Sequence, residues 1–169
     1  YFTVEELSDA ADVFPIEFHQ MSRARILLFG KDPFEFVKLS DDHLRHQAEY
    51  ELRSKLIQLR RLYIPASVSL TKLCDLMSDS LASFAALFSA VLLLHGMEPP
   101  VGKPDCVRAT VRLLDLDEQP FEKIFAMRAN GELPATEQEA NDIFAAYMLQ
   151  LERVVETVDE TKIEEPPLH

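Results

Sequence analysis

The feature that most constrains the fold is the spacing of apolar residues from Ser40 onward. Ser40-Asp41-Asp42 is a typical helix start with acidic residues in its first turn, and leucines and alanines then recur at helical spacing. The same spacing returns in four later stretches, separated by Pro or Gly, near residues 67–95, 104–114, 120–130 and 136–159. Short connections favour antiparallel packing of sequence neighbours. The sequence therefore predicts a mostly α protein with an antiparallel bundle of about five helices.

The segment before Ser40 has a different pattern. Phe14, Ile16 and Phe18 alternate with other residue types between positions 13 and 19. A period of two residues indicates a β-strand. Pro15 cannot donate a ladder hydrogen bond, so this strand would lie at a sheet edge or begin there. We therefore expect a strand at this place, which would carry the side chains of its polar face outward.

These patterns divide the chain into three regions. The apolar run Arg25–Phe29 stops at the turn signal Gly30-Lys31-Asp32-Pro33, so it is a candidate for a second short strand. We expect a small α/β element of one or two short strands at residues 1–39, the helical bundle at residues 40–160, and a frayed acidic tail at residues 161–169.

Composition limits the partners and the compartment. The net charge is -12, which opposes nonspecific binding to nucleic acid or to an anionic membrane. The apolar run Leu81–Leu94 is too short to span a bilayer and is expected to be a buried core helix. Cys74 and Cys106 lie in apolar helical patterns and outside any Cys-x-x-Cys motif, as in a reducing compartment. With no signal-peptide pattern, we expect a soluble cytoplasmic protein.

Two segments carry a resemblance to a known family. Asp12-Val13-Phe14-Pro15-Ile16-Glu17-Phe18, followed by Arg25-Ile26-Leu27-Leu28-Phe29-Gly30-Lys31-Asp32-Pro33-Phe34, resembles bacterial nucleotidyltransferase-like proteins of the polymerase-β and antibiotic-nucleotidyltransferase group. In that group a strand carries a carboxylate, a short element ends in a hydrophobic-Gly-x-Asp-Pro turn, and a helical domain follows. Members that are enzymes hold two Mg²⁺ ions with three carboxylates, and the metals clamp the attacking and leaving oxygens.

The resemblance implies roles for a few residues. Glu17 matches the third carboxylate, and Arg23, Arg25 and Lys31 lie near it in sequence and would meet a nucleotide phosphate. The other two carboxylates come from an Asp-x-Asp strand behind a Gly-Ser turn, and this chain has no Gly-Ser dipeptide. Its one Asp-x-Asp, at residues 115–117, follows Glu17 and ends a helical pattern. The chain alone is therefore expected to hold no cofactor, and Mg²⁺ only together with a catalytic half.

The chain begins with Tyr1 in place of Met, which leads us to expect that it is part of a longer protein. An N-terminal half that carries Gly-Ser and Asp-x-Asp would then supply the missing metal site.

Two histidine patterns have both a functional and a structural interpretation. Glu17 and His19 share one face of the proposed strand, where they would bind a metal or act as base and partner, or would form the outward face of an edge strand. His43 and His46 lie on one helix face, where Zn²⁺ would need a third ligand; the alternative is a solvated face.

Two functions remain open from the sequence. The first is a helical substrate-binding or accessory domain of a nucleotidyltransferase, which binds a nucleotide or a small-molecule acceptor and is not catalytically competent as this chain alone. The second is a non-catalytic protein-protein interaction module, which binds a partner or a second copy through the long amphipathic helix that carries Ile143 to Val158.

Overall fold

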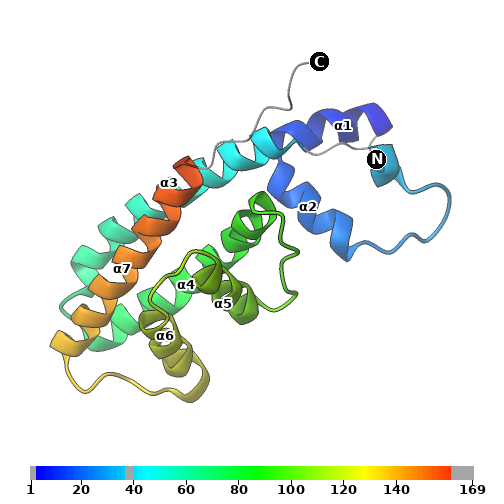
Figure 1. Ribbon diagram of the computed structural model, residues 1–169. Helices are drawn as coiled ribbons and strands as arrows, with labels where there is room; N and C mark the ends of the chain where they lie inside the picture. The colour runs from blue at the N-terminus through cyan, green and yellow to red at the C-terminus, as the bar shows by residue number, and fades with distance from the viewer. Residues whose placement is uncertain (1–2, 37–39, 161–169) are drawn as a thin grey trace.

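The computed structural model describes residues 3–36 and 40–160, and it is mostly helical (Figure 1). Seven α-helices and one 3₁₀ helix lie in these ranges, which contain no strand. The helices are α1 (Val4–Val13), α2 (Pro15–Ala24), η1 (Pro33–Phe36), α3 (Asp41–Ala66), α4 (Leu70–Leu94), α5 (Lys103–Leu113), α6 (Gln119–Asn130) and α7 (Glu137–Glu160). The prediction of a mostly α protein is confirmed, with five helices at residues 40–160.

Local signals in the sequence set most helix ends. Ser40 Oγ accepts from the backbone N–H of His43 at the start of α3, and Ser69 does the same for Lys72 at the start of α4. Thr136 Oγ1 accepts from Glu139 N at 3.1 Å at the start of α7. Gly131 ends α6 with a φ of 68°, a conformation that costs a residue with a Cβ.

The core of the bundle forms around α4, which packs against α3, α5, α6 and α7. The short connection 67–69 makes α3 and α4 an antiparallel pair. The last helix, α7, lies beside α3 and also runs antiparallel to it, because Tyr63 stacks on Phe144 with ring centroids 4.4 Å apart and Arg53 pairs with Asp159. Aromatic side chains fill the centre, where Phe84, Phe88 and Tyr147 are fully buried.

The helix α4 is the one helix in the described ranges that is long and apolar enough to cross a membrane. At 25 residues it is longer than the apolar run Leu81–Leu94, so its length does not exclude a span. Half of its most apolar window is buried inside the protein, and four other helices pack around it. This is the environment of a core helix in a soluble protein.

The strand predicted at residues 13–19 is wrong, because the structure has the helix α2 there. Alternation over so short a segment also fits a helix: Pro15, Ile16 and Phe18 of α2 are buried, Glu17 is exposed, and Phe14, which precedes α2, is half exposed. Pro15 stands in the first turn of α2, where its missing N–H costs nothing. The α/β element expected at residues 1–39 is therefore not present in the described part of that region.

The run Arg25–Phe29 is also not a strand. It forms an irregular loop between α2 and η1, and its side chains are exposed. The tail expected at residues 161–169 lies outside the described residues. The proposed domain boundary near residue 40 stays a prediction, since α2 packs on α3 across it and Ile16 belongs to the core of the bundle.

Candidate functional site

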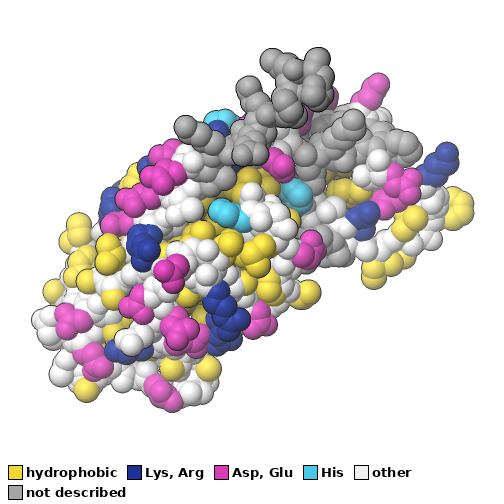
Figure 2. Space-filling view, in the orientation of Figure 1, with side chains coloured by type: hydrophobic (Ala, Val, Ile, Leu, Met, Phe, Trp, Pro, Cys, Tyr) yellow, Lys and Arg dark blue, Asp and Glu magenta, His cyan; other side chains and the backbone are white. Residues whose placement is uncertain are grey.

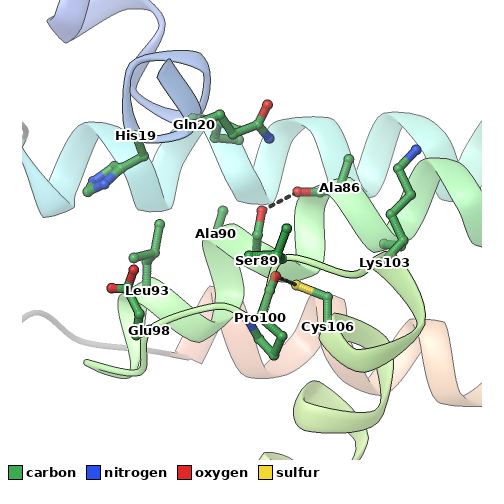
Figure 3. A pocket seen from close by; sticks show the side chains of 13 residues that line it. His19, Gln20, Ala86, Ser89, Ala90, Leu93, Glu98, Pro100, Lys103 and Cys106 are labelled. Atoms are coloured by element: carbon green, nitrogen blue, oxygen red, sulfur yellow. Dashed lines mark hydrogen bonds between the residues drawn. The ribbon is translucent and has the colours of Figure 1, made fainter. Parts of the chain in front are cut away.

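A hollow of about 800 Å³ lies between α2, α4 and the segment that leads from α4 into α5 (Figure 3). Its volume is in the range of small-molecule sites, and its lining is mostly apolar. The apolar part comes from Ile16, Ala85, Ala86, Ala90, Leu93, Pro100 and Val101. The polar part comes from His19, Gln20, Ser89, Glu98, Lys103 and Cys106.

The space exists because α4 presents small side chains to α2. Ala86, Ser89 and Ala90 lie on the face of α4 beneath His19 and Gln20, which project from α2 (Figure 3). Ser89 Oγ donates to the backbone oxygen of Ala86 at 2.6 Å, so this hydroxyl is engaged by its own helix. Short side chains on α4 thus leave the space between the two helices unfilled.

A second hollow of about 350 Å³ adjoins the first. The two share Ile16, Gln20, Ala86 and Lys103 in their linings, and together we call them the α2–α4 groove. The smaller hollow is the more polar of the two. It adds four polar or charged side chains, from α2, α3 and α4: Glu17, Glu51, Lys55 and Ser83.

Gln47 organises the acidic side of the smaller hollow. Its amide Nε2 donates to Glu17 Oε2 at 3.1 Å and to Glu51 Oε1 at 3.0 Å. Its Oε1 accepts from the backbone N–H of Ile16 at 3.1 Å, near the start of α2. The side chain of Gln47 therefore binds the first turn of α2 and also donates to the carboxylates of Glu17 and Glu51.

The basic side of the smaller hollow comes from two lysines. Lys55 belongs to α3, and Lys103 is the first residue of α5. Within the part of the chain that the structure describes, no carboxylate forms an ion pair with either lysine. The groove thus combines two carboxylates and two ammonium groups next to an apolar hollow.

Of the three cations that the resemblance placed near a phosphate, Arg25 is already engaged by a carboxylate. Arg25 binds Asp32, with Nε donating to Oδ2 at 2.9 Å, and stacks over Phe34. The hydrogen bonds from Arg25 and from the backbone of Phe34 lower the pKa of Asp32. Lys31 is exposed, and the side chain of Arg23 lies outside the described atoms. A phosphate would therefore compete with Asp32 for Arg25.

The expectation that Glu17 and His19 share one face is wrong. The two residues lie on a helix, where positions two apart point in different directions. Glu17 is exposed and lines the smaller hollow, whereas His19 is half buried and lines the larger one. The role of Glu17 as a third carboxylate stays a prediction, now on a helix in place of a strand.

The other metal candidates have protein partners. His43 Nδ1 lies 3.1 Å from Asp12 Oδ1, and His46 Nε2 lies 3.1 Å from Arg45 Nη2. Among residues 3–36 and 40–160, no group of three or more His, Cys, Asp or Glu side chains could hold a metal ion. The Asp-x-Asp at residues 115–117 follows the end of α5 at Leu113, and Asp115 has a φ of 48°, so its interpretation as a helix exit is confirmed. Asp117 Oδ1 also accepts from Gln119 N at the start of α6.

Both cysteines are buried and neither forms a disulfide. Desolvation and the nearby charge of Asp75 raise the pKa of Cys74, which keeps this thiol protonated and unreactive. Cys106 lines the larger hollow, where its thiol donates to the backbone oxygen of Pro100 at 3.7 Å.

Sequence reasoning missed Gln47 and Lys103. Lys103 had one available signal, since it stands directly before the proline that opens a helix, but its neighbours in the groove come from α2 and α4. The groove itself also had a signal in the sequence. The small residues Ala82, Ala86 and Ser89 recur at helical spacing within the run Leu81–Leu94, which the sequence predicted to be a core helix. Only the packing of α2 shows that this face borders a hollow.

Comparisons with known proteins return no significant similarity. No protein-family model matches the chain, no curated protein matches it, and no solved structure matches its fold.

Proposed function

We propose that this chain is the helical accessory domain of a nucleotidyltransferase-like protein, located in the cytoplasm. The observation that carries the proposal is the exposure of the segment with the family pattern. Ile26, Leu28 and Phe29 are 84%, 92% and 97% exposed, and they lie on the loop between α2 and η1. Figure 2 shows apolar side chains gathered on this loop, at the right of the view.

The exposure of this loop needs a reason because consecutive exposed apolar residues of this size favour association or burial. A catalytic half that packs on the loop would remove these side chains from water. In that arrangement α2 would face the cleft with Glu17, and the bundle would form one wall of a site for a nucleotide or a small acceptor. Mg²⁺ would then be held by Glu17 together with the carboxylates of the catalytic half.

The first test is the intact mass of the native protein, compared with its coding sequence. Residues ahead of Tyr1 that contain Gly-Ser followed by Asp-x-Asp would support the proposal. A native protein that starts at or near Tyr1 would overturn it.

The second test is calorimetric titration of ATP with Mg²⁺ into the full-length protein. We expect binding heat that Glu17→Gln reduces by about tenfold or more in affinity, because a metal ligand is lost. The matched control is Glu35→Gln, which removes an exposed carboxylate from η1. The absence of heat at millimolar ligand, or an equal effect of both variants, would contradict the proposed role of Glu17.

A second candidate function, a non-catalytic interaction module, has its own observation. The apolar face of α7 is used inside the bundle, where residues such as Phe144, Leu151 and Val158 are buried. The outer face of α3, in contrast, carries Tyr50 and Ile57 seven residues apart and Ile64 seven further on, at 72%, 57% and 73% exposure. This α3 stripe is the surface that a second copy would use. A dimer in light scattering would support this function.

A further inference from the structure

We propose that the α2–α4 groove binds a free α-amino acid with a large apolar side chain. The inference does not depend on the nucleotidyltransferase resemblance. It rests on the juxtaposition of an apolar hollow with a smaller hollow that carries both kinds of charge.

The smaller hollow matches the head of such a molecule. An α-amino acid carries one ammonium and one carboxylate on the same carbon. Glu17 and Glu51 offer acceptors, since each has carboxylate lone pairs beyond the single bond that it accepts from Gln47. Lys55 and Lys103 offer donors, and no ion pair within the described residues neutralises them. A ligand with only one charge would leave one of these pairs unmatched.

The larger hollow matches an apolar side chain. Its floor on α4 is made of three alanines, Leu93 and Ser89, and the Ser89 hydroxyl is already bound to its own helix. A volume of about 800 Å³ accommodates a bicyclic aromatic side chain with room to spare. Lys103 lines both hollows, so it lies where the head of the ligand would meet its apolar body (Figure 3).

The chain itself supplies a sharp assay, because it contains no Trp. L-tryptophan, excited at wavelengths where the four tyrosines of the chain do not absorb, is therefore a probe whose fluorescence reports only the ligand. We expect its emission to shift to the blue and its anisotropy to rise as the full chain is added. Tryptamine lacks the carboxylate and 3-indolepropionate lacks the ammonium, and each should bind about fivefold more weakly or worse, since each loses one charged contact.

Variants locate the site. Lys103→Gln should weaken L-tryptophan binding by about fivefold, because it removes one partner of the carboxylate. The matched control is Lys123→Gln on α6, outside both hollows, which should leave the affinity unchanged. Ala86→Leu should weaken binding by filling the groove, whereas Ala145→Leu on the exposed face of α7 should not. Circular dichroism of each variant checks that the helices remain.

The outcomes separate the possibilities. No change in anisotropy at millimolar L-tryptophan would overturn the inference. So would equal affinity for all three indole compounds, or equal effects of Lys103→Gln and Lys123→Gln, even if every variant is folded. If Ala86→Leu unfolds the protein, the comparison of the three ligands on the unchanged chain still decides. Binding of L-tryptophan without binding of ATP would support this inference while the proposed function failed.

Discussion

At the scale of single residues, Tyr147 is the clearest case of a polar group inside the core. Its ring is fully buried and meets Phe121 edge-on, with centroids 5.7 Å apart. Its hydroxyl lies 3.3 Å from Ser80 Oγ, which itself donates to the backbone of Met77, so Tyr147 donates and Ser80 accepts. Burial raises the pKa of Tyr147 far above its ordinary value of 10.0.

This shift makes stability depend on pH in one direction. Below pH 10.0 Tyr147 is protonated in both states and contributes no dependence. Above it the unfolded chain releases the proton and the folded chain keeps it, so the free energy of unfolding falls by up to about 1.4 kcal/mol per pH unit. Tyr147→Phe should remove this part of the loss, at a cost of about 0.5–1.5 kcal/mol at neutral pH.

Urea unfolding at neutral pH and at about pH 11 measures both effects. The control is Tyr50→Phe, since Tyr50 is largely exposed and its replacement should alter neither value. An alkaline loss of stability that is the same in wild type and Tyr147→Phe would contradict the argument.

At the scale of elements, α2 depends on a few contacts with the bundle. It packs on α3, and Ile16 is its one residue in the main core cluster of the described chain. The side chain of Gln47 connects Ile16 and Glu17 to α3 through two hydrogen bonds. A short helix with so few anchors is expected to open locally before the bundle unfolds.

Gln47→Leu should therefore weaken the attachment of α2 by about 1–3 kcal/mol, since the carboxylates and the N–H of Ile16 lose their common partner. Amide hydrogen exchange should accelerate in α2 and remain unchanged at the centre of α4. Gln58→Leu, at an exposed position of the same helix, is the matched control. Equal protection of α2 in both variants would show that Gln47 does not anchor it.

At the scale of the whole molecule, charge and exposed apolar surface act against each other. The net charge of -12 repels a second copy, whereas the α3 stripe favours association. Arg53 and Arg60 lie on the same helix and pair with Asp159 and Glu152 of α7, so these two cations are locally balanced by acids of their own chain. Screening should therefore decide the balance.

We expect self-association to rise as salt increases from low to moderate concentration, because screening removes the repulsion and leaves the apolar contact. Ile57→Glu should abolish this association, since it places a charge at the middle of the α3 stripe. Light scattering measures the mass of both proteins across the salt series. A strict monomer under all conditions, or a dimer that Ile57→Glu does not change, would argue against an interface at the α3 stripe.

The sequence by itself determined the elements of the bundle. Caps such as Ser40 and Thr136, the proline at the start of α6 and the left-handed Gly131 act within a few residues, so their effect is readable from local order. The apolar periodicity that follows each cap also predicted which face of the helix is buried. These signals are local because a helix satisfies its own backbone.

Only the tertiary structure decided the state of residues 13–19 and the existence of the groove. Alternation over so few residues fits a strand or a helix. In the structure the segment is a helix, whose first turn is bound to α3 by the hydrogen bond from Ile16 N to Gln47 and whose Phe18 side chain is buried. The groove depends on Glu17, Gln47 and Lys103, which are far apart in sequence and come near one another only when α2 packs on α3 and α5 packs on α4. Contacts between residues so far apart in sequence leave no local sequence pattern, because the packing of the helices determines which residues meet.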